Sequence, residues 1–387
     1  MKFDLQHALE QHRKKFAAEG RAFSAPARVN LIGEHTDYTG GFVMPAAIDF
    51  YTVAVVSPRS DGRAILWSEG FGDAEYKLAG LQAEPRSHWS DYPIGAAWAL
   101  HQEGIALSGF NLSLSGNVPL GAGLSSSASV EVATAMALLA HARATLSGEN
   151  IATLCRRAEN EYVGAKSGIM DQFAVANAAH GTALLLDCAT LKYELLPLPA
   201  DVRIVICNSM VTHAVTGGEY AECRDQVEEG QAALRKYNAA IRWLRDTTVE
   251  DLNACRDSMS PGAFGRCRHI ITENIRVQQA KAALLSGDMA RFGELMAEAH
   301  ISFRDDFAAS CAEVDTLVEI ARTLPGCVGS RITGGGFGGC TVNLVEADAA
   351  EKFAAELKRK YYAATGITAE CYLCDSSDGA VLLNSPH

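Results

Sequence analysis

The segment from Gly121 to Ser127 contains the residue types that a phosphate site requires. Gly121 and Gly123 let the backbone turn tightly and bring its N–H groups close to a ligand. Three serines follow, and residues 130–142 predict a buried helix whose apolar part contains one charged residue, Glu131. Because a helix N-terminus has unpaired N–H groups and a partial positive charge, it suits an anion. The members of this predicted phosphate loop are Gly121, Ala122, Gly123, Leu124, Ser125, Ser126 and Ser127.

The alternative for this segment is an ordinary loop, which a glycine- and serine-rich run between a strand and a helix usually forms. Residues 110–115 alternate apolar and polar side chains and predict the preceding strand. The P-loop pattern G-x-x-x-x-G-K-[ST] is absent from the sequence, so a phosphate site here would work without the lysine of that motif. The segment alone leaves both interpretations open.

A second group of polar residues lies between the apolar runs 29–32 and 42–48. It contains Glu34, His35 and Asp37. Carboxylates and an imidazole can bind several hydroxyl groups of a sugar by directed hydrogen bonds. A plain turn capped by the Asp37 side chain is the alternative, because aspartate favours such turns.

A third group, Gly334, Gly336 and Gly339, spells the G-x-G-x-x-G pattern of dinucleotide-binding proteins. That pattern has to open a helix, whereas residues 341–345 predict a strand, so we reject dinucleotide binding. A protein kinase is rejected as well, because the H-R-D and D-F-G triplets are absent from the sequence. The glycine loop is better explained as a lid over phosphates.

Composition limits the classes of protein further. The chain has 387 residues, of which 48% are hydrophobic and 21% charged, as in ordinary globular proteins. It is longer than the roughly 250–300 residues at which a single core stops growing, which favours two domains. The net charge of −12 argues against a nucleic acid or an anionic membrane as a partner.

The cysteines and the N-terminus indicate the compartment. Eleven cysteines are scattered without the spacing of a disulfide framework, which favours a reducing cytosol. Cys371 and Cys374 form the single CxxC pair of the sequence, and we interpret them as buried strand cysteines. The charges from Lys2 onward do not fit a signal peptide, and no apolar run reaches the roughly 18 residues of a membrane span. We expect a cytoplasmic monomer.

The remaining patterns predict two α+β domains, divided near Pro197 and Pro199 into residues 1–196 and 197–387. The second half is the more helical. Predicted strands cover residues 23–32, 51–57, 183–187, 202–207, 341–345 and 367–374. Predicted helices cover residues 5–19, 89–102, 151–163, 219–237, 269–285, 292–307 and 349–364.

Three motifs of the chain resemble those of the GHMP small-molecule kinases. Residues 116–128 resemble the family's P-x-x-x-G-L-x-S-S-A signature, and residues 25–38 are similar to the signature of its sugar kinases. Residues 333–340 match the third motif, and all three occur in family order. The resemblance favours the phosphate loop over an ordinary loop. It implies an N-terminal domain and a ferredoxin-like C-terminal domain, with the ligands in the cleft between them.

The resemblance also implies individual roles. Ser127 and Glu159 correspond to the ligands of Mg²⁺, which accepts one hydroxyl and one carboxylate from a protein together with waters and phosphates. On the predicted helix, Glu159 shares a face with Cys155 and Tyr162, which is unusual for a solvated charge. ATP would be bound by the phosphate loop and by Ser68.

For the second substrate, the resemblance implies a sugar whose hydroxyl gives its proton to Asp171, with Arg28 beside that carboxylate. The family usually has glycine where Ala27 stands, so either the backbone is extended there or Arg28 is displaced. The residues implied to bind the sugar are Glu34, His35, Thr36, Asp37, Asp171 and Tyr220.

The implied reaction is the transfer of the γ-phosphoryl group of ATP to the C1 hydroxyl of galactose, the first step of galactose catabolism. Two alternatives stay open, a kinase for a related sugar such as N-acetylgalactosamine and a catalytically silent sensor of galactose and ATP. Such sensors lose residues of the serine-rich loop, whereas residues 125–129, Glu159 and Asp171 are intact in this chain.

Overall fold

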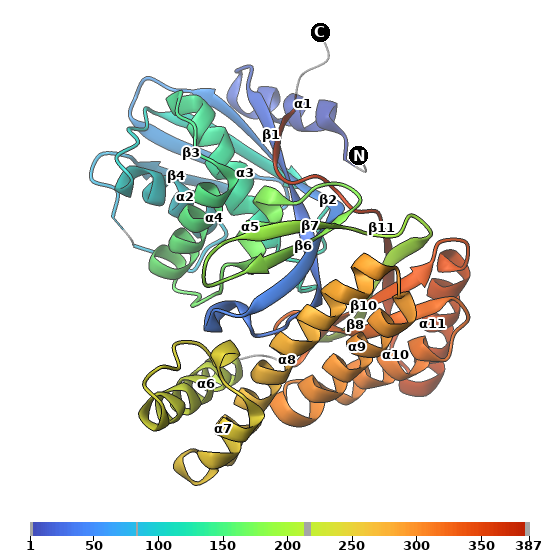
Figure 1. Ribbon diagram of the computed structural model, residues 1–387. Helices are drawn as coiled ribbons and strands as arrows, with labels where there is room; N and C mark the ends of the chain where they lie inside the picture. Colours follow the sequence, from blue (N-terminus) through green and yellow to red (C-terminus); the bar gives the residue numbers. More distant parts are fainter. Residues whose placement is uncertain (1–2, 83, 213–217, 384–387) are drawn as a thin grey trace.

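The valine-rich segment 51–57 lies in the long strand β2 (Phe42–Pro58), which pairs antiparallel with β1 (Arg21–Ile32). These strands are the centre of an eight-stranded sheet with the order β12-β1-β2-β5-β3-β4, to which β6 and β7 attach through β2 (Figure 1). Its other strands are β3 (Arg63–Ser68), β4 (Gly72–Lys77), β5 (Phe110–Gly116), β6 (Thr182–Asp187), β7 (Tyr193–Pro197) and β12 (Val381–Leu383). The computed structural model describes residues 3–82, 84–212 and 218–383.

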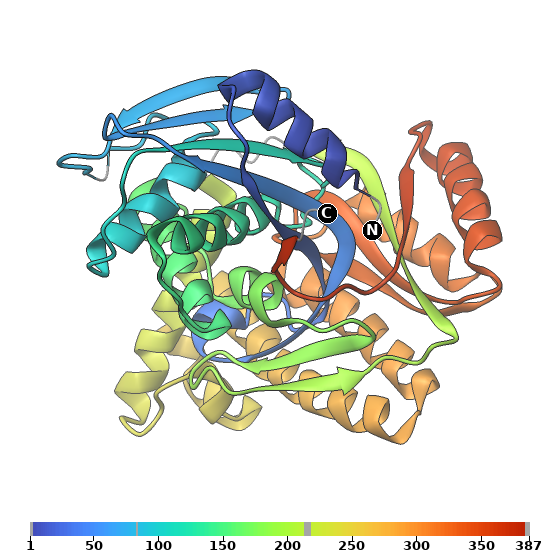
Figure 2. The ribbon, with the colours of Figure 1, turned by 90° about the horizontal axis from the view of Figure 1, so that it is seen from above.

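Helices cover both faces of this first sheet (Figure 2). Because side chains alternate along a strand, Ala54 of β2 points to one helical layer, whereas Val53 and Val55 point to the helix on the other face. The single helix is α1 (Leu5–Phe16), and the opposite layer contains α2 (Asp91–Gln102), α3 (Ser126–Ala142), α4 (Gly148–Arg157) and α5 (Met170–Asn177).

The second domain is built on a four-stranded antiparallel sheet with the order β11-β8-β10-β9. Its strands are β8 (Val202–Thr212), β9 (Cys327–Thr333), β10 (Gly338–Glu346) and β11 (Glu370–Cys374). The predicted strand–helix–strand unit at the C-terminus is present, but β8 lies between its two strands. This split arrangement is typical of ferredoxin-like domains.

Alternation along β8 again divides the core of the second domain. Val205 and Cys207 face α10 (Ala312–Arg322) and α11 (Ala350–Thr365). Ile204 and Ile206 belong to a cluster that also contains residues of β1, β2, α8 (Pro261–Ser286) and α9 (Met289–Ser302). Beside α8 lie α6 (Gly218–Tyr237) and α7 (Val249–Ala254), at the lower edge of Figure 1. The two domains therefore share one apolar cluster.

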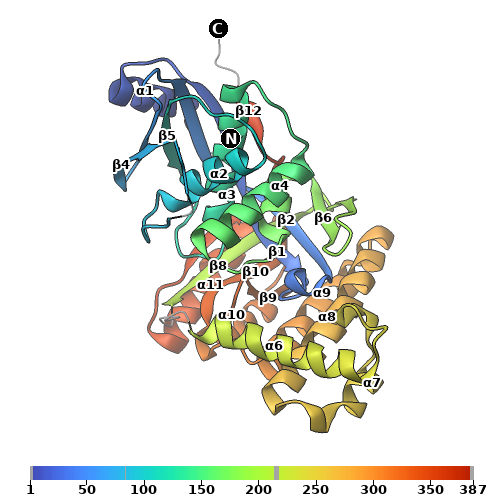
Figure 3. The same ribbon diagram turned by 90° about the vertical axis from the view of Figure 1, so that its left-hand side faces the viewer.

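The chain passes between the two sheets twice. Strand β7 ends at Pro197 and β8 begins at Val202, close to the predicted boundary. Near the C-terminus the chain returns to the first sheet, where Leu383 of β12 pairs with Ala22 of β1 (Figure 3). The division of the chain into domains of residues 1–196 and 197–387 stays a prediction. The last strand, β12, lies within the second of these ranges but belongs to the first sheet.

Several helices differ from the expectation, among them α8, which begins at Pro261 rather than at residue 269. The helix expected from residue 130 begins at Ser126, so that Ser126 and Ser127 of the phosphate loop lie in its first turn. The helix expected over residues 151–163 is α4 followed by a π-helix, η2 (Ala158–Val163), and residues 292–307 divide in the same way into α9 and the π-helix η5 (Phe303–Phe307). Within the described residues, the helices lack the combination of length and apolar character that crossing a bilayer requires.

Candidate active site

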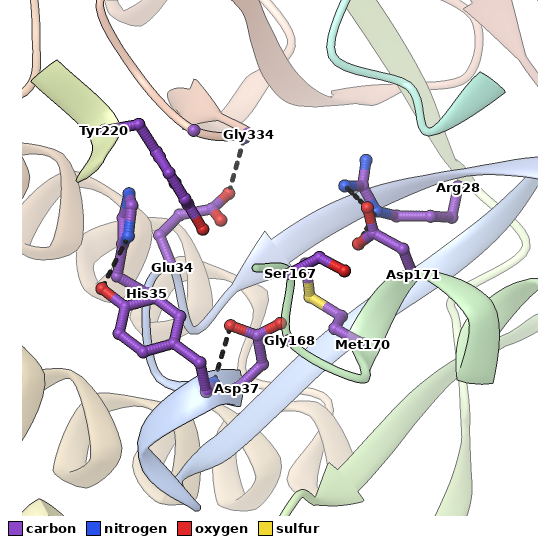
Figure 4. Close-up of a pocket in the computed structure, with 12 residues that line it drawn as sticks. Arg28, Glu34, His35, Asp37, Ser167, Gly168, Met170, Asp171, Tyr220 and Gly334 are labelled. Carbon is purple, nitrogen blue, oxygen red and sulfur yellow. Dashed lines mark hydrogen bonds and ion pairs between the residues drawn. The ribbon is translucent and has the colours of Figure 1, made fainter. Parts of the chain in front are cut away.

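A cavity of about 180 Å³ lies where the end of β1, the start of α5 and the glycine loop between β9 and β10 meet (Figure 4). It is lined by polar side chains from both domains. The lining residues are Arg28, Glu34, His35, Asp37, Tyr38, Ser167, Gly168, Met170, Asp171, Tyr220, Gly334 and Gly335. Six of the residues that the sequence assigned to sugar or catalysis therefore meet in one place.

At one end of the cavity, Arg28 binds the carboxylate of Asp171 with two hydrogen bonds, of 2.8 Å from Nε and 2.7 Å from Nη2. Its Nη1 donates to the carbonyl oxygen of Gly123 at 2.7 Å. Ala27 lies in β1 with a negative φ, so alanine costs nothing there and Arg28 is not displaced. Ser125 donates to Asp171 as well, at 2.5 Å, and so joins the phosphate loop to the carboxylate.

Glu34 and His35 follow β1 directly and lie at the opposite end. Oε1 of Glu34 accepts a hydrogen bond of 3.0 Å from the backbone N–H of Gly334. Burial raises the pKa of the Glu34 carboxyl, and Arg331 opposes that rise. Burial lowers the pKa of His35 to about 3, so its ring is neutral at pH 7. That ring stacks on Phe307 with 4.1 Å between centroids.

Asp37 and Tyr220 complete the wall of the cavity. Burial, together with the nearby Asp171, raises the pKa of the Asp37 carboxyl to about 6. Gly168 leaves room for this carboxylate, since a Cβ at that position would lie 1.7 Å from Oδ2 of Asp37. Burial also raises the pKa of Tyr220, so its hydroxyl keeps its proton and can both donate and accept. Figure 4 shows Tyr220 pointing into the space between Glu34 and Asp37.

Thr36 differs from the expectation that it contacts the sugar. Its side chain is fully buried, and it is not among the residues that line the cavity. Oγ1 lies 2.8 Å from the carbonyl oxygen of Gly33 and 2.6 Å from that of Phe42. The hydroxyl thus closes the turn that presents Glu34 and Asp37.

The phosphate loop has the geometry that its glycines predict. Gly121 and Gly123 have φ values of 70° and 69°, which glycine adopts without strain. Ala122 and Leu124 are buried in the apolar cluster shared by the domains and anchor the loop. The N-terminus of α3 follows at once and supplies unpaired N–H groups.

A second cavity of about 330 Å³ lies beside this loop. Ser68 and Ser126, both predicted to bind the nucleotide, line it together with Leu114, Val118 and Val130. Its combination of apolar walls and a few polar groups is typical of sites for small molecules.

Glu159 lies in the π-helix η2 and is buried, as its predicted neighbours indicated. Its Oε2 accepts a hydrogen bond of 2.9 Å from Nε2 of Gln172, and Ser167 also donates to it. The same Nε2 donates to Glu131 of α3 at 3.0 Å, and Ser127 lies one helical turn before Glu131. This chain of contacts connects the helices that carry the two predicted magnesium ligands.

Among the described residues, no group of three or more His, Cys, Asp or Glu side chains is arranged to hold a metal ion. The two predicted ligands, Glu159 and Ser127, supply one carboxylate and one hydroxyl. This donor set fits a magnesium site that the phosphates of a nucleotide complete.

Several of the residues that line the cavity have no role predicted from the sequence. Tyr38 is the last residue of the signature over residues 25–38, and Ser167 and Met170 lie beside Gly168 and Asp171, but the sequence patterns gave these three no role. Gly334 and Gly335 were expected over phosphates, but they line the same cavity as Glu34. The backbone N–H of Gly334 is used there, and a side-chain pattern does not reveal such a contact.

Three family models match the chain. Residues 10–58 match the galactokinase galactose-binding signature, residues 91–178 the GHMP kinases N terminal domain and residues 280–363 the GHMP kinases C terminal model. These models cover the sugar signature, the phosphate loop and the part of the second domain from the end of α8 to α11.

Similar proteins include the galactokinase of Roseiflexus sp., 42% identical over 92% of this chain and 91% of the relative. The human galactokinase is 43% identical over 98% of this chain and 96% of the relative. The crystal structure of Lactococcus lactis galactokinase complexed with galactose has a TM-score of 0.94 and 34% identity, covering 98% of this chain and 100% of that one. The mevalonate kinase of Methanococcus jannaschii shares the fold, with a TM-score of 0.67 at 19% identity.

Fold and site together define a GHMP kinase, an ATP-dependent small-molecule kinase with an N-terminal and a C-terminal domain of the α+β class. Within that class, the chain belongs to the galactokinase family of sugar kinases.

Proposed function

We propose that this enzyme transfers the γ-phosphoryl group of ATP to the C1 hydroxyl of galactose and releases galactose 1-phosphate and ADP. The observation that carries the proposal is the position of Asp171. Its carboxylate lies in the sugar-sized cavity and accepts a hydrogen bond from Ser125 of the phosphate loop. A hydroxyl bound at Asp171 would therefore lie next to a phosphate bound at the loop.

Glu34, His35, Asp37 and Tyr220 are proposed to bind the other hydroxyl groups of the sugar. Their carboxylates accept hydrogen bonds, and the tyrosine hydroxyl both donates and accepts. Such a site discriminates strongly against a sugar that lacks or misplaces a hydroxyl, because buried polar groups are then left without partners.

In the proposed transfer step, Asp171 accepts the proton of the C1 hydroxyl while the oxygen attacks the γ-phosphorus. The bond between the γ-phosphorus and the oxygen that bridges the β- and γ-phosphates breaks, and ADP leaves. Arg28 holds Asp171 in place and offsets the negative charge of the reacting groups. Positioning and charge neutralisation supply most of the acceleration in phosphoryl transfer, so a weak base suffices.

We propose that the triphosphate of ATP lies against residues 121–127 and that its base occupies the cavity beside Ser68. Ser127 and Glu159 would hold Mg²⁺, which would neutralise charge on the phosphates. Gln172 and Ser167 support this assignment, since they fix the orientation of the Glu159 carboxylate.

The test is ADP release from the purified chain, measured by a coupled assay with galactose, glucose, N-acetylgalactosamine and no sugar. Galactose should give the highest kcat/KM, and glucose, which differs at C4, should be a poor substrate. A preference for N-acetylgalactosamine would assign the enzyme to that sugar, and galactose binding without ADP release would indicate a sensor. Light scattering during gel filtration tests the proposed monomer.

A further inference from the structure

The residues that present the sugar site at the end of β1 are held by side chains from the second domain. The backbone N–H of Gly33 donates to Oε1 of Glu273 at 2.8 Å. The carbonyl oxygen of Glu34 lies 3.3 Å from Nε2 of His269. Both Glu273 and His269 lie on α8. The orientation of Glu34 therefore depends on contacts across the domain boundary.

Arg331 of β9 makes the most direct of these contacts. Its side chain is fully buried, and Nη1 lies 3.3 Å from Oε1 of Glu34 and 3.4 Å from the carbonyl oxygen of Leu31. Oε1 also receives the hydrogen bond of the Gly334 N–H, from the end of the same strand. Within the described chain, Nε and Nη2 of Arg331 have no hydrogen-bond partner, so its hydrogen bonds run through Nη1 alone.

The chemistry at Glu34 depends on its charge. A buried carboxyl without a positive partner takes up a proton and becomes a donor as well as an acceptor. Burial raises the pKa of Glu34, and Arg331 is the largest influence that lowers it, ahead of Gly334 and Arg28. Asp37, whose pKa the charge of Glu34 helps to raise, is a further charged group near Glu34, and on α8 Glu273 and Arg276 pair with each other at 2.7 Å.

We propose that Arg331 is a positioning residue for sugar recognition: it holds Glu34 as a carboxylate with Oε1 fixed, so that the other oxygen accepts a hydrogen bond from a sugar hydroxyl. The inference rests on the proposed function, in which Glu34 binds the sugar. Arg331 does not line the cavity, so it acts through Glu34. A residue of the second domain thus contributes to sugar specificity without touching the sugar.

The test compares Arg331→Met and Arg331→Lys with the wild-type enzyme. Methionine removes the charge, whereas lysine keeps a charge but ends in a shorter side chain without the nitrogen that lies at the position of Nη1. Arg245→Met is the matched control, because Arg245 forms a part-buried ion pair of 2.6 Å with Asp187 between the same domains, away from the cavity. Calorimetry gives the Kd for galactose and for its 2-, 3-, 4- and 6-deoxy analogues, and kinetics give the KM for ATP.

Glu34→Gln is measured with the same sugars, to identify the hydroxyl that Glu34 binds. That hydroxyl is the one whose deletion makes the variant and the wild type equal. Arg331→Met should weaken galactose binding by about 10-fold or more, the effect expected for a lost charged hydrogen bond. The KM of Arg331→Met for ATP should stay within about 2-fold of the wild-type value. The Kd of the Arg245→Met control for galactose should stay within the same range. With the one deoxy sugar that Glu34→Gln identifies, Arg331→Met and the wild type should have nearly equal Kd values.

Equal losses of Arg331→Met on every deoxy sugar would mean general damage to the site and would overturn the proposal. Galactose binding as in the wild type would overturn it as well. If Glu34→Gln itself shows no hydroxyl dependence, the proposed sugar contact of Glu34 fails, and the role of Arg331 fails with it. Should Arg331→Met not fold, Arg331→Lys serves in its place, with the same pattern expected.

Discussion

Arg28 and Asp171 lie 143 positions apart in the sequence and form a two-pronged ion pair in the cavity. The side chain of Arg28 is only 6% exposed, whereas that of Asp171 is 28% exposed on the cavity side. Arg28 thus holds the Asp171 carboxylate from the buried side, and the exposed side of that carboxylate is accessible to a substrate. Such planar pairs add geometric precision as well as charge compensation.

Asp171→Asn should lower kcat by at least about 100-fold, because the amide keeps the shape but cannot accept the proton. Arg28→Ala should also lower kcat. The double variant should lose less than the product of the two single losses, since the residues act as a unit. Steady-state kinetics with galactose provide the measurement. A near-normal kcat for Asp171→Asn would leave Asp171 as a sugar-binding group only.

Glu159→Gln should severely lower the turnover that Mg²⁺ supports and leave galactose binding nearly unchanged. The amide keeps the hydrogen-bonding size of the carboxylate but removes the charge that binds the ion. Glu161→Gln is the matched control in the same π-helix, because Glu161 is exposed and pairs with Arg157 at 3.1 Å. Titration of activity with Mg²⁺ and calorimetry with galactose separate the two effects. Wild-type Mg²⁺ dependence in Glu159→Gln would refute the assignment.

Galactose affinity should fall as the pH decreases through about 6, the pKa to which burial and Asp171 raise Asp37. Above that pH the carboxylate accepts a hydrogen bond from the sugar, and below it the neutral acid is a poorer acceptor. Calorimetric titrations between pH 5 and pH 8 test this dependence. In Asp37→Asn the step near pH 6 should be absent. An unchanged step in that variant would assign it to another group.

The same substitution should stabilise the folded protein at pH 8. A carboxyl whose pKa is raised from 3.8 to about 6 by folding lowers the free energy of unfolding above that pH. The cost reaches at most about 3 kcal/mol and disappears below about pH 4. Asp37→Asn should therefore have a higher Tm than wild type at pH 8 and an equal Tm near pH 4. Equal Tm values at both pH values would contradict the raised pKa.

Gly168→Ala should raise the KM for galactose by about 10-fold or more and leave the KM for ATP nearly unchanged. The new methyl group would meet Oδ2 of Asp37, so this carboxylate would have to leave its position. Gly335→Ala is the control within the same cavity, since its Cβ would lie 3.7 Å from the Tyr220 ring, an ordinary contact. Equal kinetics of the two variants would show that Asp37 is not held in place by Gly168.

Local patterns in the sequence were sufficient where the backbone itself sets the outcome. The phosphate loop has Gly121 and Gly123 at positive φ, as glycines in a tight turn predict. The third glycine group is followed by β10 rather than by a helix, because residues 341–345 favour a strand. The motif order placed the sugar residues at the end of β1, and Glu34, His35 and Asp37 line the cavity there.

Only the tertiary structure decided which side chains meet. The hydroxyl of Thr36 turns inward to two carbonyl oxygens, although its neighbours Glu34 and Asp37 face the cavity. Arg331 reaches Glu34 across 297 positions of sequence. Residue type and spacing define a local backbone, whereas the direction of a side chain and its distant partner depend on the packing of two domains around one shared core.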